Sequence, residues 1–365
     1  MKIAFLGSRG IPANYGGFET CAEALALRLV AKGHQVSVYC CKPYSKNESL
    51  FYAGIKRIVL PTLQKKSLEK LVFTILSLIH VVFTKTDVIL MFGISASLFC
   101  FIPRLFGIKV VINVDGLEWK REKWGRLASF YLRCSEHIAC FSAHRLVTDA
   151  RCVQDYYQDT YQQETTFIPY GVRERPDAFD GKTMQSLGVR PWEYVLYVSR
   201  FEPENNPLVV RRAFEQVNTV KQLLLVGSAP YATAYIQEVH HSQDRRILFP
   251  GAIYGNGYEE LLCHAYVYIQ ATSVGGVHPA LVEAIGFGNC IIANDVPEHR
   301  EVLQDAGIYY DGSEADLAKQ LQDVLDHPQK VADMRTRAGR LAKQYSWDAI
   351  LEEYTKVFSR AMGTG

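Results

Sequence analysis

The sequence has few of the features that mark a disulfide-rich, membrane-spanning or nucleic-acid-binding protein. Its nine cysteines are an odd number without CxxC spacing, which argues against a disulfide framework and favours reduced, mostly buried thiols in the cytoplasm. The net charge of +2 is too small for binding nucleic acid through bulk charge. With 48% apolar residues, the 365-residue chain is long enough for two globular domains.

Several nucleotide- and metal-binding motifs are also missing. The dinucleotide fingerprint GxGxxG is absent after the first predicted strand, and Pro176 stands where GxxxxGK[ST] needs its first glycine. No DxD occurs, so a magnesium-bridged diphosphate is not expected; we predict no metal and no other cofactor. The absence of GxSxG argues against a serine hydrolase.

The longest apolar stretch is too short to cross a membrane. Leu71–Phe83 has 13 residues between flanking lysines, whereas a spanning helix needs about 20. Two interpretations of residues 65–85 stay open: a buried helix packed on a sheet, or a partly exposed helix resting on an anionic inner-membrane surface. Residues 1–175 hold 23 Lys and Arg against 14 Asp and Glu, and residues 176–365 hold 17 against 24. The basic first half agrees with a peripheral membrane protein, although ordinary surface variation explains it equally well.

Strand-like runs alternate with helical stretches along the whole chain. In the first half we predict a helix at 18–32 and strands at 2–6, 35–40, 87–92, 109–114 and 137–141. In the second half we predict helices at 207–217, 258–265 and 279–287, and strands at 194–199, 222–226, 267–270 and 290–293. Alternation of this kind predicts an α/β fold with parallel sheets covered by helices.

The composition places the domain boundary in a polar segment rich in proline and glycine, residues 173–191. We predict Rossmann-like domains at 1–175 and 176–345, and a final helix at 346–362 that packs back on the first domain. Ligands of such sheets bind outside the carboxyl ends of the strands, so the predicted site is the cleft between the two domains.

Three segments that follow predicted strands carry the candidate chemistry. Gly16 and Gly17 lie just before the first helix, where backbone N–H groups can approach an anion; a plain turn is the alternative. Arg200 ends a strand in the second domain, where its guanidinium can bind a diphosphate; the alternative is a surface ion pair with Glu202 or Glu204.

The third segment, residues 272–283, also follows a strand. Pro279 suits the first position of a helix, so the N–H groups around 276–280 would point at an anion. Glu283, one turn further on, can accept hydrogen bonds from both hydroxyls of a ribose. The alternative is a carboxylate that stabilises the helix dipole.

In their order and spacing these pieces resemble GT-B glycosyltransferases of the large retaining family 4, over the whole chain. Within it the chain resembles a bacterial subgroup of rhamnosyltransferases that assemble surface polysaccharides. The resemblance rests on GSRGIPANYGGFET at 7–20, VDGLEWKREKW at 114–124, SRFEPENNP at 199–207 and VGGVHPALVEA at 274–284. It implies a GT-B fold, with two Rossmann-like domains facing each other across a cleft, and a hexosyltransferase that needs no metal.

The resemblance also implies roles for individual residues. Arg200 would bind the donor diphosphate and Glu283 the ribose, while the nucleotide base would lie by 250–253. The complete donor-side set is Gly16, Gly17, Ser199, Arg200, Asn205, Gly251, Gly275, Gly276, Val277, His278, Pro279, Ala280 and Glu283.

The sequence departs from the family pattern at three of these positions. Asn205 stands where the family has a lysine, Gly275 where it has a glutamate, and His278 where we expect an asparagine.

The first domain would hold the acceptor, a saccharide that we expect on a polyprenyl diphosphate. Trp119, Lys120 and Arg121 are the predicted acceptor-side residues, and Asp115 or Glu118 would orient the acceptor hydroxyl or take its proton. A salt-bridged structural turn is the alternative for this segment. With no agreed protein nucleophile in the family, catalysis would come from placement of the substrates and from stabilisation of the leaving diphosphate by Arg200.

Rhamnose from dTDP-rhamnose is the favoured donor, and other functions stay open. The same fold could use a UDP- or GDP-sugar. A nucleotide-sugar 2-epimerase would convert the donor without an acceptor, and a non-catalytic binding partner would bind the donor without transfer. A dehydrogenase is disfavoured because the dinucleotide fingerprint is absent.

Overall fold

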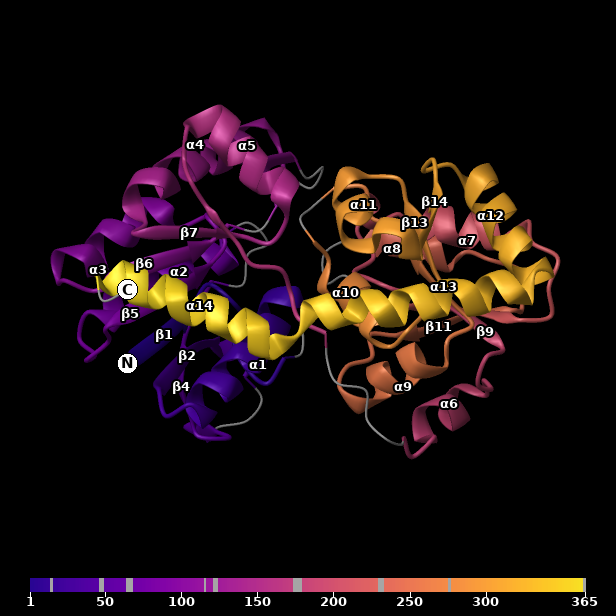
Figure 1. Ribbon diagram of the computed structural model, residues 1–365, viewed down its shortest axis with the longest axis horizontal. Coiled ribbons are helices and arrows are strands. Elements are labelled where there is room, and N and C mark those ends of the chain that lie inside the picture. Colours follow the sequence, from indigo (N-terminus) through magenta and orange to yellow (C-terminus); the bar gives the residue numbers. More distant parts are fainter. Residues whose placement is uncertain are drawn as a thin grey trace. The chain divides into compact units, whose positions relative to one another are not determined.

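The computed structural model describes residues 1–13, 16–45, 49–63, 68–114, 116–120, 124–172, 179–228, 233–274 and 277–363. These residues form two compact units. The first consists of Met1–Lys120, Trp124–Tyr170 and Trp347–Gly365, and the second extends from Gly171 to Ser346. The chain therefore returns to the first unit for its last helix (Figure 1).

The first unit is built on an eight-stranded sheet in the order β3-β4-β2-β1-β5-β6-β7-β8. All neighbouring strands are parallel except β3 and β4, which form an antiparallel pair. The strands are β1 (Lys2–Leu6), β2 (Gln35–Cys41), β3 (Phe51–Tyr52), β4 (Ile55–Leu60), β5 (Val88–Phe92), β6 (Lys109–Asn113), β7 (Arg145–Thr148) and β8 (Thr166–Phe167). The central strands β1 and β5 are apolar and almost wholly buried, as strands covered on both faces must be.

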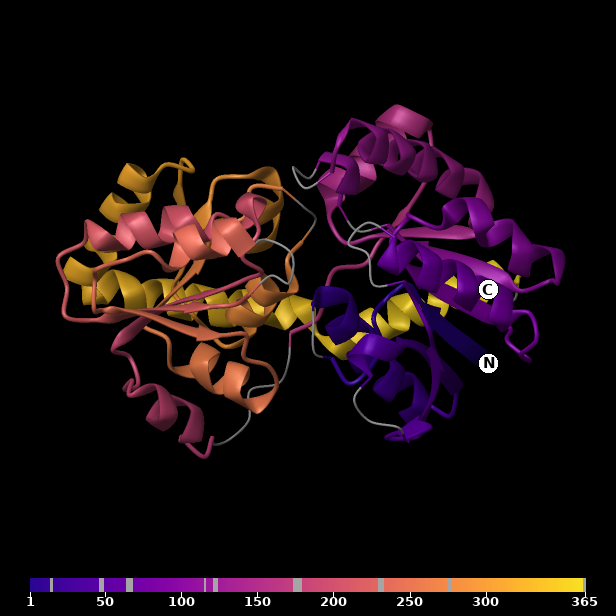
Figure 2. The same cartoon turned by 180° about the vertical axis from the view of Figure 1, so that it is seen from behind.

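Helices cover both faces of this sheet. They are α1 (Gly17–Ala31), α2 (Glu69–Val81), α3 (Phe101–Leu105), α4 (Arg126–Ser142), α5 (Arg151–Tyr161) and α14 (Trp347–Met362), with short 3-10 turns η1 (Lys42–Tyr44), η2 (Ser97–Cys100) and η3 (Glu118–Lys120). Helix α14 packs on α1, β5 and β6, and it crosses in front of the strands in Figure 1 and behind them in Figure 2. Inside this contact Asn113 Nδ2 donates to Tyr354 Oη at 2.9 Å, so a buried polar pair helps to anchor the last helix on β6.

The second unit contains a six-stranded parallel sheet in the order β11-β10-β9-β12-β13-β14. Its strands are β9 (Tyr194–Val198), β10 (Gln222–Val226), β11 (Ile247–Gly251), β12 (Val267–Gln270), β13 (Ile291–Asn294) and β14 (Gly307–Tyr310). Its helices are α6 (Lys182–Leu187), α7 (Pro207–Glu215), α8 (Thr233–His240), α9 (Asn256–His264), α10 (Pro279–Gly286), α11 (Pro297–Leu303), α12 (Glu314–Asp326) and α13 (Pro328–Leu341), with 3-10 turns η4 (Pro203–Asn205), η5 (Gln304–Ala306) and η6 (Ala342–Tyr345).

The core of the second unit lies between the sheet and the amphipathic helices α7 and α12. Val195 and Leu223 of the sheet meet Phe214 of α7 and Leu321 of α12, all wholly buried. The order of the strands reverses direction between β9 and β12, because the chain moves outward from β9 to β11 and then crosses back to β12. This point is where doubly wound sheets bind their ligands.

Most predicted elements occur close to their predicted bounds, and two predictions are wrong. The segment 137–141, predicted as a strand, lies inside helix α4, and the strand comes after it as β7. Short apolar runs do not distinguish the two states; the buried positions Leu132, Ser135, Glu136 and Ala139 follow helical spacing. The predicted linker 173–191 contains helix α6, whose Thr183 and Met184 N–H groups donate to the buried Glu260 carboxylate.

Gly227 closes the turn after β10 where there is no room for a side chain. A Cβ atom at this position would lie 1.8 Å from the backbone oxygen of Ser199, and φ is +155°. The Gly227 N–H donates to Gly251 O, and Ser199 N–H donates to Val226 O. The carboxyl ends of β9, β10 and β11 are thus held together by backbone contacts that only glycine permits.

Replacing Gly227 with alanine should therefore lower the free energy of unfolding by about 2–3 kcal/mol, because the backbone must move away from Ser199. The measurement is the urea midpoint. Gly339→Ala is the matched control: Gly339 lies inside helix α13 with no atom near its Cβ position, so alanine should stabilise by about 0.5–1 kcal/mol. Equal midpoints for the two variants would contradict this account of Gly227.

Candidate functional site

Arg200 lies just beyond the carboxyl end of β9, beside the turn that Gly227 closes. Its side chain is 31% exposed, and Nη1 lies 3.8 Å from Glu202 Oε2. That distance is at the outer limit of an ion pair, and the carboxylate leaves the cationic fork partly open to solvent. Arg200 is therefore placed to bind an anion at this edge of the sheet. The ion pair with Glu202, which was the alternative interpretation from the sequence, is also present.

Asn205 braces the loop that carries Arg200. Its side chain is buried, and Nδ2 donates to the backbone oxygen of Arg200 at 2.7 Å. The backbone oxygen of Asn205 in turn accepts from Tyr197 Oη at 2.7 Å. This amide stands where the resemblance implied a lysine, and it organises the turn behind Arg200 instead of presenting a second cation.

Helix α10 begins at the same edge, after β12. His278 occupies the position before the helix, Pro279 is its first residue and Ala280 follows. Val277 is buried, whereas Gly275 and Gly276 lie outside the described residues. The first turn of a helix has N–H groups without intrahelical partners, and its dipole favours an anion there.

Glu283, one turn into α10, is 5% exposed. Its Oε2 accepts a hydrogen bond of 2.8 Å from Tyr258 Oη on α9. The tyrosine holds one carboxylate oxygen, which fixes the side chain at the start of α10 instead of leaving it to rotate. The sequence does not predict this hydrogen bond, because Tyr258 and Glu283 lie on different helices that only the folded structure brings together.

A buried polar network supports the loop between β12 and α10. Thr272 Oγ1 lies 3.1 Å from His299 Nε2, and His299 Nδ1 lies 2.8 Å from the backbone oxygen of Asn294. Because that oxygen can only accept, the neutral ring carries its proton on Nδ1 and accepts from Thr272. Gln270 also donates to Thr272. Burial lowers the pKa of His299 to about 4, so the ring is neutral at pH 7.

In the first unit, the glycine loop after β1 is tied down by two glutamates of α1. Glu19 Oε1 accepts from Arg9 N, and Glu23 Oε2 accepts from Ala13 N, both at 2.6 Å. Gly16 caps the helix and Gly17 begins it. The carboxylates satisfy loop N–H groups, so an anion here would have to use the N–H groups of the helix start itself.

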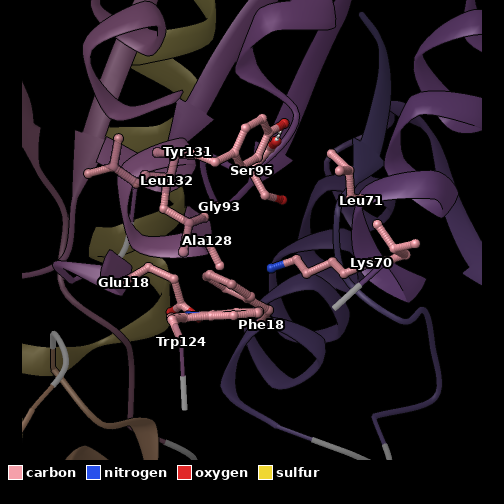
Figure 3. Close-up of a pocket in the computed structure, with 13 residues that line it drawn as sticks. Phe18, Lys70, Leu71, Gly93, Ser95, Glu118, Trp124, Ala128, Tyr131 and Leu132 are labelled. Atoms are coloured by element: carbon pink, nitrogen blue, oxygen red, sulfur yellow. Dashed lines mark hydrogen bonds between the residues drawn. The ribbon is translucent and has the colours of Figure 1, made fainter. Parts of the chain in front are cut away.

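A cavity of about 340 Å³ lies at the carboxyl edge of the first sheet (Figure 3). It is walled by the starts of α1, α2 and α4 and by the loops after β5 and β6. Its lining consists of Phe18, Leu68, Lys70, Leu71, Gly93, Ile94, Ser95, Val114, Glu118, Trp124, Ala128, Tyr131 and Leu132. A mostly apolar wall with few polar groups is typical of small-molecule sites.

Two charged side chains face this cavity. Lys70 Nζ lies 4.4 Å from the centre of the Phe18 ring, and Figure 3 shows it extending above Phe18 and Trp124. Gly93 makes room for it, since a Cβ there would lie 3.0 Å from Nζ. Across the cavity, Glu118 Oε1 accepts from Trp124 Nε1 at 3.2 Å. The cavity therefore offers an ammonium, a carboxylate and aromatic faces to one ligand.

Of the predicted acceptor-side residues within the described chain, Glu118 lines the cavity. Trp119 and Lys120 are not among its lining residues; Trp119 instead packs against the Arg133 guanidinium, 5.0 Å from its ring centre. Asp115 and Arg121 lie outside the described residues. Phe18, Lys70 and Tyr131 were not predicted from the sequence. Trp124 was not predicted either, although it closes the VDGLEWKREKW motif.

Two known families match the chain, one over each of the two sheets. Residues 1–173 match a domain of unknown function, DUF1972, and residues 193–327 match the family described as glycosyl transferases group 1. The second unit carries a glycosyl transferases group 1 domain. A search of curated proteins finds no match to the sequence.

Solved structures of the same fold cover essentially the whole chain. Sucrose-phosphate synthase from Thermosynechococcus elongatus superposes with a TM-score of 0.82 at 18% identity, covering 100% of both chains. HepE from Anabaena, solved with UDP-glucose, gives 0.80 at 18% identity, covering 99% of this chain and 100% of that one. WaaG, a glycosyltransferase of lipopolysaccharide biosynthesis, gives 0.75 at 16% identity over 98% and 99%. These structures confirm the predicted GT-B fold, and residues 193–327 match the glycosyl transferases group 1 family.

Neither a metal cluster nor a membrane-spanning helix is found in the described part of the chain. No group of three or more His, Cys, Asp or Glu side chains there could hold a metal ion. None of its helices combines the length and the apolar character needed to cross a bilayer. None of the nine cysteines, all of which lie in the described part of the chain, forms a disulfide, and six of them are buried.

The buried His299 predicts a pH-dependent stability. Its pKa is about 4 when folded and 6.5 when exposed, so the unfolded chain binds a proton first as the pH falls. The contribution is complete above about pH 6.5 and is lost towards pH 4, up to about 3 kcal/mol. The urea midpoint should therefore fall further between pH 7 and pH 4.5 in wild type than in His299→Gln.

The exposed His327 provides the matched control. His327→Gln should keep the wild-type pH dependence, since this ring is mostly in solvent. If His299→Gln and wild type lose the same stability between the two pH values, the buried neutral ring is not the cause.

Proposed function

We propose that the chain is a retaining rhamnosyltransferase that uses dTDP-rhamnose. Its acceptor would be a saccharide on a polyprenyl diphosphate, at the inner face of the plasma membrane, during assembly of a surface polysaccharide. The observation that carries the proposal is the cavity with Lys70 and Glu118 at the carboxyl edge of the first sheet, in a chain whose second unit is a group 1 domain. The rhamnosyl assignment within the retaining family 4 rests on the motifs at 7–20 and 114–124.

The donor would bind along the carboxyl edge of the second sheet. Arg200 would pair with the diphosphate, and the N–H groups at the start of α10 would bind its second phosphate or the sugar. Glu283, held by Tyr258, would accept from the ribose hydroxyls. Ser199 and Gly251 stand at the ends of β9 and β11 on the same edge, so they suit the remaining contacts proposed from the sequence.

The acceptor would enter the cavity of the first unit. Its volume accommodates a monosaccharide unit, and Phe18 and Trp124 offer apolar faces for a sugar ring. Glu118 would accept a hydrogen bond from the attacking hydroxyl. Lys70 adds a positive charge to the same cavity, which suits the diphosphate of a lipid-linked acceptor.

The chemistry would be a same-face displacement. The bond between the anomeric carbon and the diphosphate oxygen breaks, and the bond to the acceptor oxygen forms on the same side. The hydroxyl proton passes to Glu118 or to the leaving diphosphate, whose growing negative charge Arg200 stabilises. This assigns charge stabilisation and placement to the protein, with no covalent intermediate.

A UDP-sugar is the second candidate donor. HepE has been solved with UDP and with UDP-glucose, and its fold covers the whole chain at 18–19% identity. That identity is too low to transfer the base preference. The base must therefore be determined directly.

Thermal shifts with dTDP, UDP, GDP and ADP, followed by dTDP-rhamnose, test the donor. We expect dTDP and dTDP-rhamnose to stabilise the protein most, by about 2.7 kcal/mol when the ligand is at a hundredfold its Kd. Preference for UDP or GDP would keep the transferase and reject rhamnose. No shift with any nucleotide would contradict the donor site.

Glu118→Gln tests the acceptor side, because the amide oxygen can still accept from Trp124 while the charge is lost. Transfer should fall by about 10²–10⁴-fold if Glu118 handles the acceptor proton. The donor-induced thermal shift should not change. Glu164→Gln, an exposed carboxylate of the same unit, is the control. Wild-type transfer rates in Glu118→Gln would remove this residue from the mechanism.

A further inference from the structure

Helices α2, α3 and α4 of the first unit expose an unusual amount of apolar surface. Helix α2 packs on α3, and η2 packs on both α2 and α4, so the segments form one continuous surface. Eleven of the eighteen large apolar side chains exposed in the described part of the chain lie on these segments or at their ends, against three in the whole second unit. The most exposed include Phe83, Phe101, Leu105, Leu127, Phe130 and Phe141; we call this surface the apolar face.

Helix α4 exposes large apolar side chains on the side that is polar in an ordinary surface helix. Leu127, Phe130 and Phe141 follow one outward stripe and are 87%, 69% and 71% exposed. The inward side buries Ser135 and Glu136, whose carboxylate accepts from Tyr156 and Tyr161 at 2.8 and 2.7 Å. Leu132 and Ala139 are buried beside these polar groups, so apolar side chains lie on both sides of the helix, and water alone does not favour the outward ones.

Helix α2 carries apolar side chains on both sides, since it also buries Phe73, Leu78 and Val81. Ser77 and Thr74 are buried and donate to backbone oxygens of the preceding turn, whereas Leu76 and Ile79 are exposed. The structure combines features of the two interpretations left open for residues 65–85: α2 packs on β1 and β4 of the sheet, and it is also partly exposed. A group of exposed apolar side chains on neighbouring helices marks a binding surface.

The charges on these segments select the partner. The structure describes α2, η2, α3 and α4 in full, and their only acidic side chains, Glu69 and Glu136, are 3% and 1% exposed. Arg104, Arg126 and Arg133 are exposed on the same helices. Arginines around exposed phenylalanine and leucine match an anionic bilayer, in which apolar groups enter the interface and cations remain at the headgroups. A second copy of the same face would instead bring like charges together.

We propose that the apolar face inserts into the interface of an anionic membrane and delivers a bilayer-anchored acceptor to the cavity. The inference rests on the proposed function, because it makes the cavity the acceptor site. The two are joined at Leu68, which lines the cavity and is exposed at the start of α2. The starts of α2 and α4 wall the cavity, and the rest of both helices carries the apolar face. A lipid-linked head group can therefore reach Lys70 while its chain stays in the bilayer.

Flotation with phosphatidylcholine vesicles, with and without phosphatidylglycerol, tests the proposal on the full-length protein. Wild type should float with the anionic vesicles and much less with the neutral ones. The triple variant Leu105→Ser, Leu127→Ser and Phe130→Ser should bind about tenfold more weakly or worse, because apolar side chains no longer enter the interface. Val220→Ser, at an equally exposed site in the second unit, should bind as wild type does.

Charge variants test the cationic part. Arg126→Gln with Arg133→Gln should weaken binding to anionic vesicles about tenfold and leave neutral vesicles unaffected. Arg190→Gln with Arg340→Gln, two exposed arginines of the second unit, is the matched control. Salt should weaken the wild-type interaction in the same direction.

Donor binding separates failure of this inference from failure of the proposed function. All these variants should keep the wild-type thermal shift with dTDP-rhamnose and wild-type circular dichroism. A protein that binds dTDP-rhamnose and ignores anionic vesicles would overturn the membrane face alone. A wild-type dimer that the triple variant dissociates would assign the face to a second copy, and would overturn it as well.

Discussion

The carboxyl edges of the two parallel sheets depend on backbone contacts too close for any side chain. At Gly227 a Cβ would meet the Ser199 oxygen at 1.8 Å, and at Gly7 it would meet the Phe92 oxygen at 2.5 Å. These contacts hold adjacent strand ends together, so the segments that follow them leave the sheet side by side. Arg200 and Phe18 stand on such segments, and Lys70 contacts Phe18. The packing of adjacent strand ends therefore determines where these side chains lie.

The carboxyl edges of the two sheets present different side chains and therefore suit different ligands. In the second unit the loop after β9 presents Arg200, braced by Asn205, while α10 presents its positive end and Glu283. In the first unit the loops after β5 and β6 enclose an apolar cavity with one cation and one carboxylate. A charged, open edge suits a diphosphate, and an enclosed aromatic cavity suits a sugar ring. This division is the physical basis for assigning donor and acceptor.

The sequence predicted what depends on local pattern and missed what depends on packing. Strands such as β1, β9 and β10 are apolar runs bounded by glycine or polar residues, and helix starts such as Pro279 have local signals. The strand prediction for 137–141 failed because a histidine followed by four apolar residues fits a strand or a helix, and only burial at helical spacing decides between them.

The same limit applies to the site. Arg200 and Glu118 follow strands in the sequence and could be selected, whereas Lys70 and Tyr258 reach their places only through contacts between distant helices. An exposed apolar side was one of two interpretations left open for α2, and none was predicted for α3 or α4. The outward stripe of α4 was hidden because amphipathic spacing does not tell which side faces the sheet.

The central claim is that this chain moves rhamnose from a nucleotide to a lipid-linked acceptor with Arg200 at the leaving diphosphate. The most direct measurement incubates the protein with radiolabelled dTDP-rhamnose and bacterial inner-membrane vesicles and follows label into the lipid fraction. The account predicts lipid-linked label with wild type and a loss of about 10²-fold or more with Arg200→Ala, whose folding should remain intact. Label that stays in the nucleotide fraction, or equal incorporation by Arg200→Ala, would contradict it.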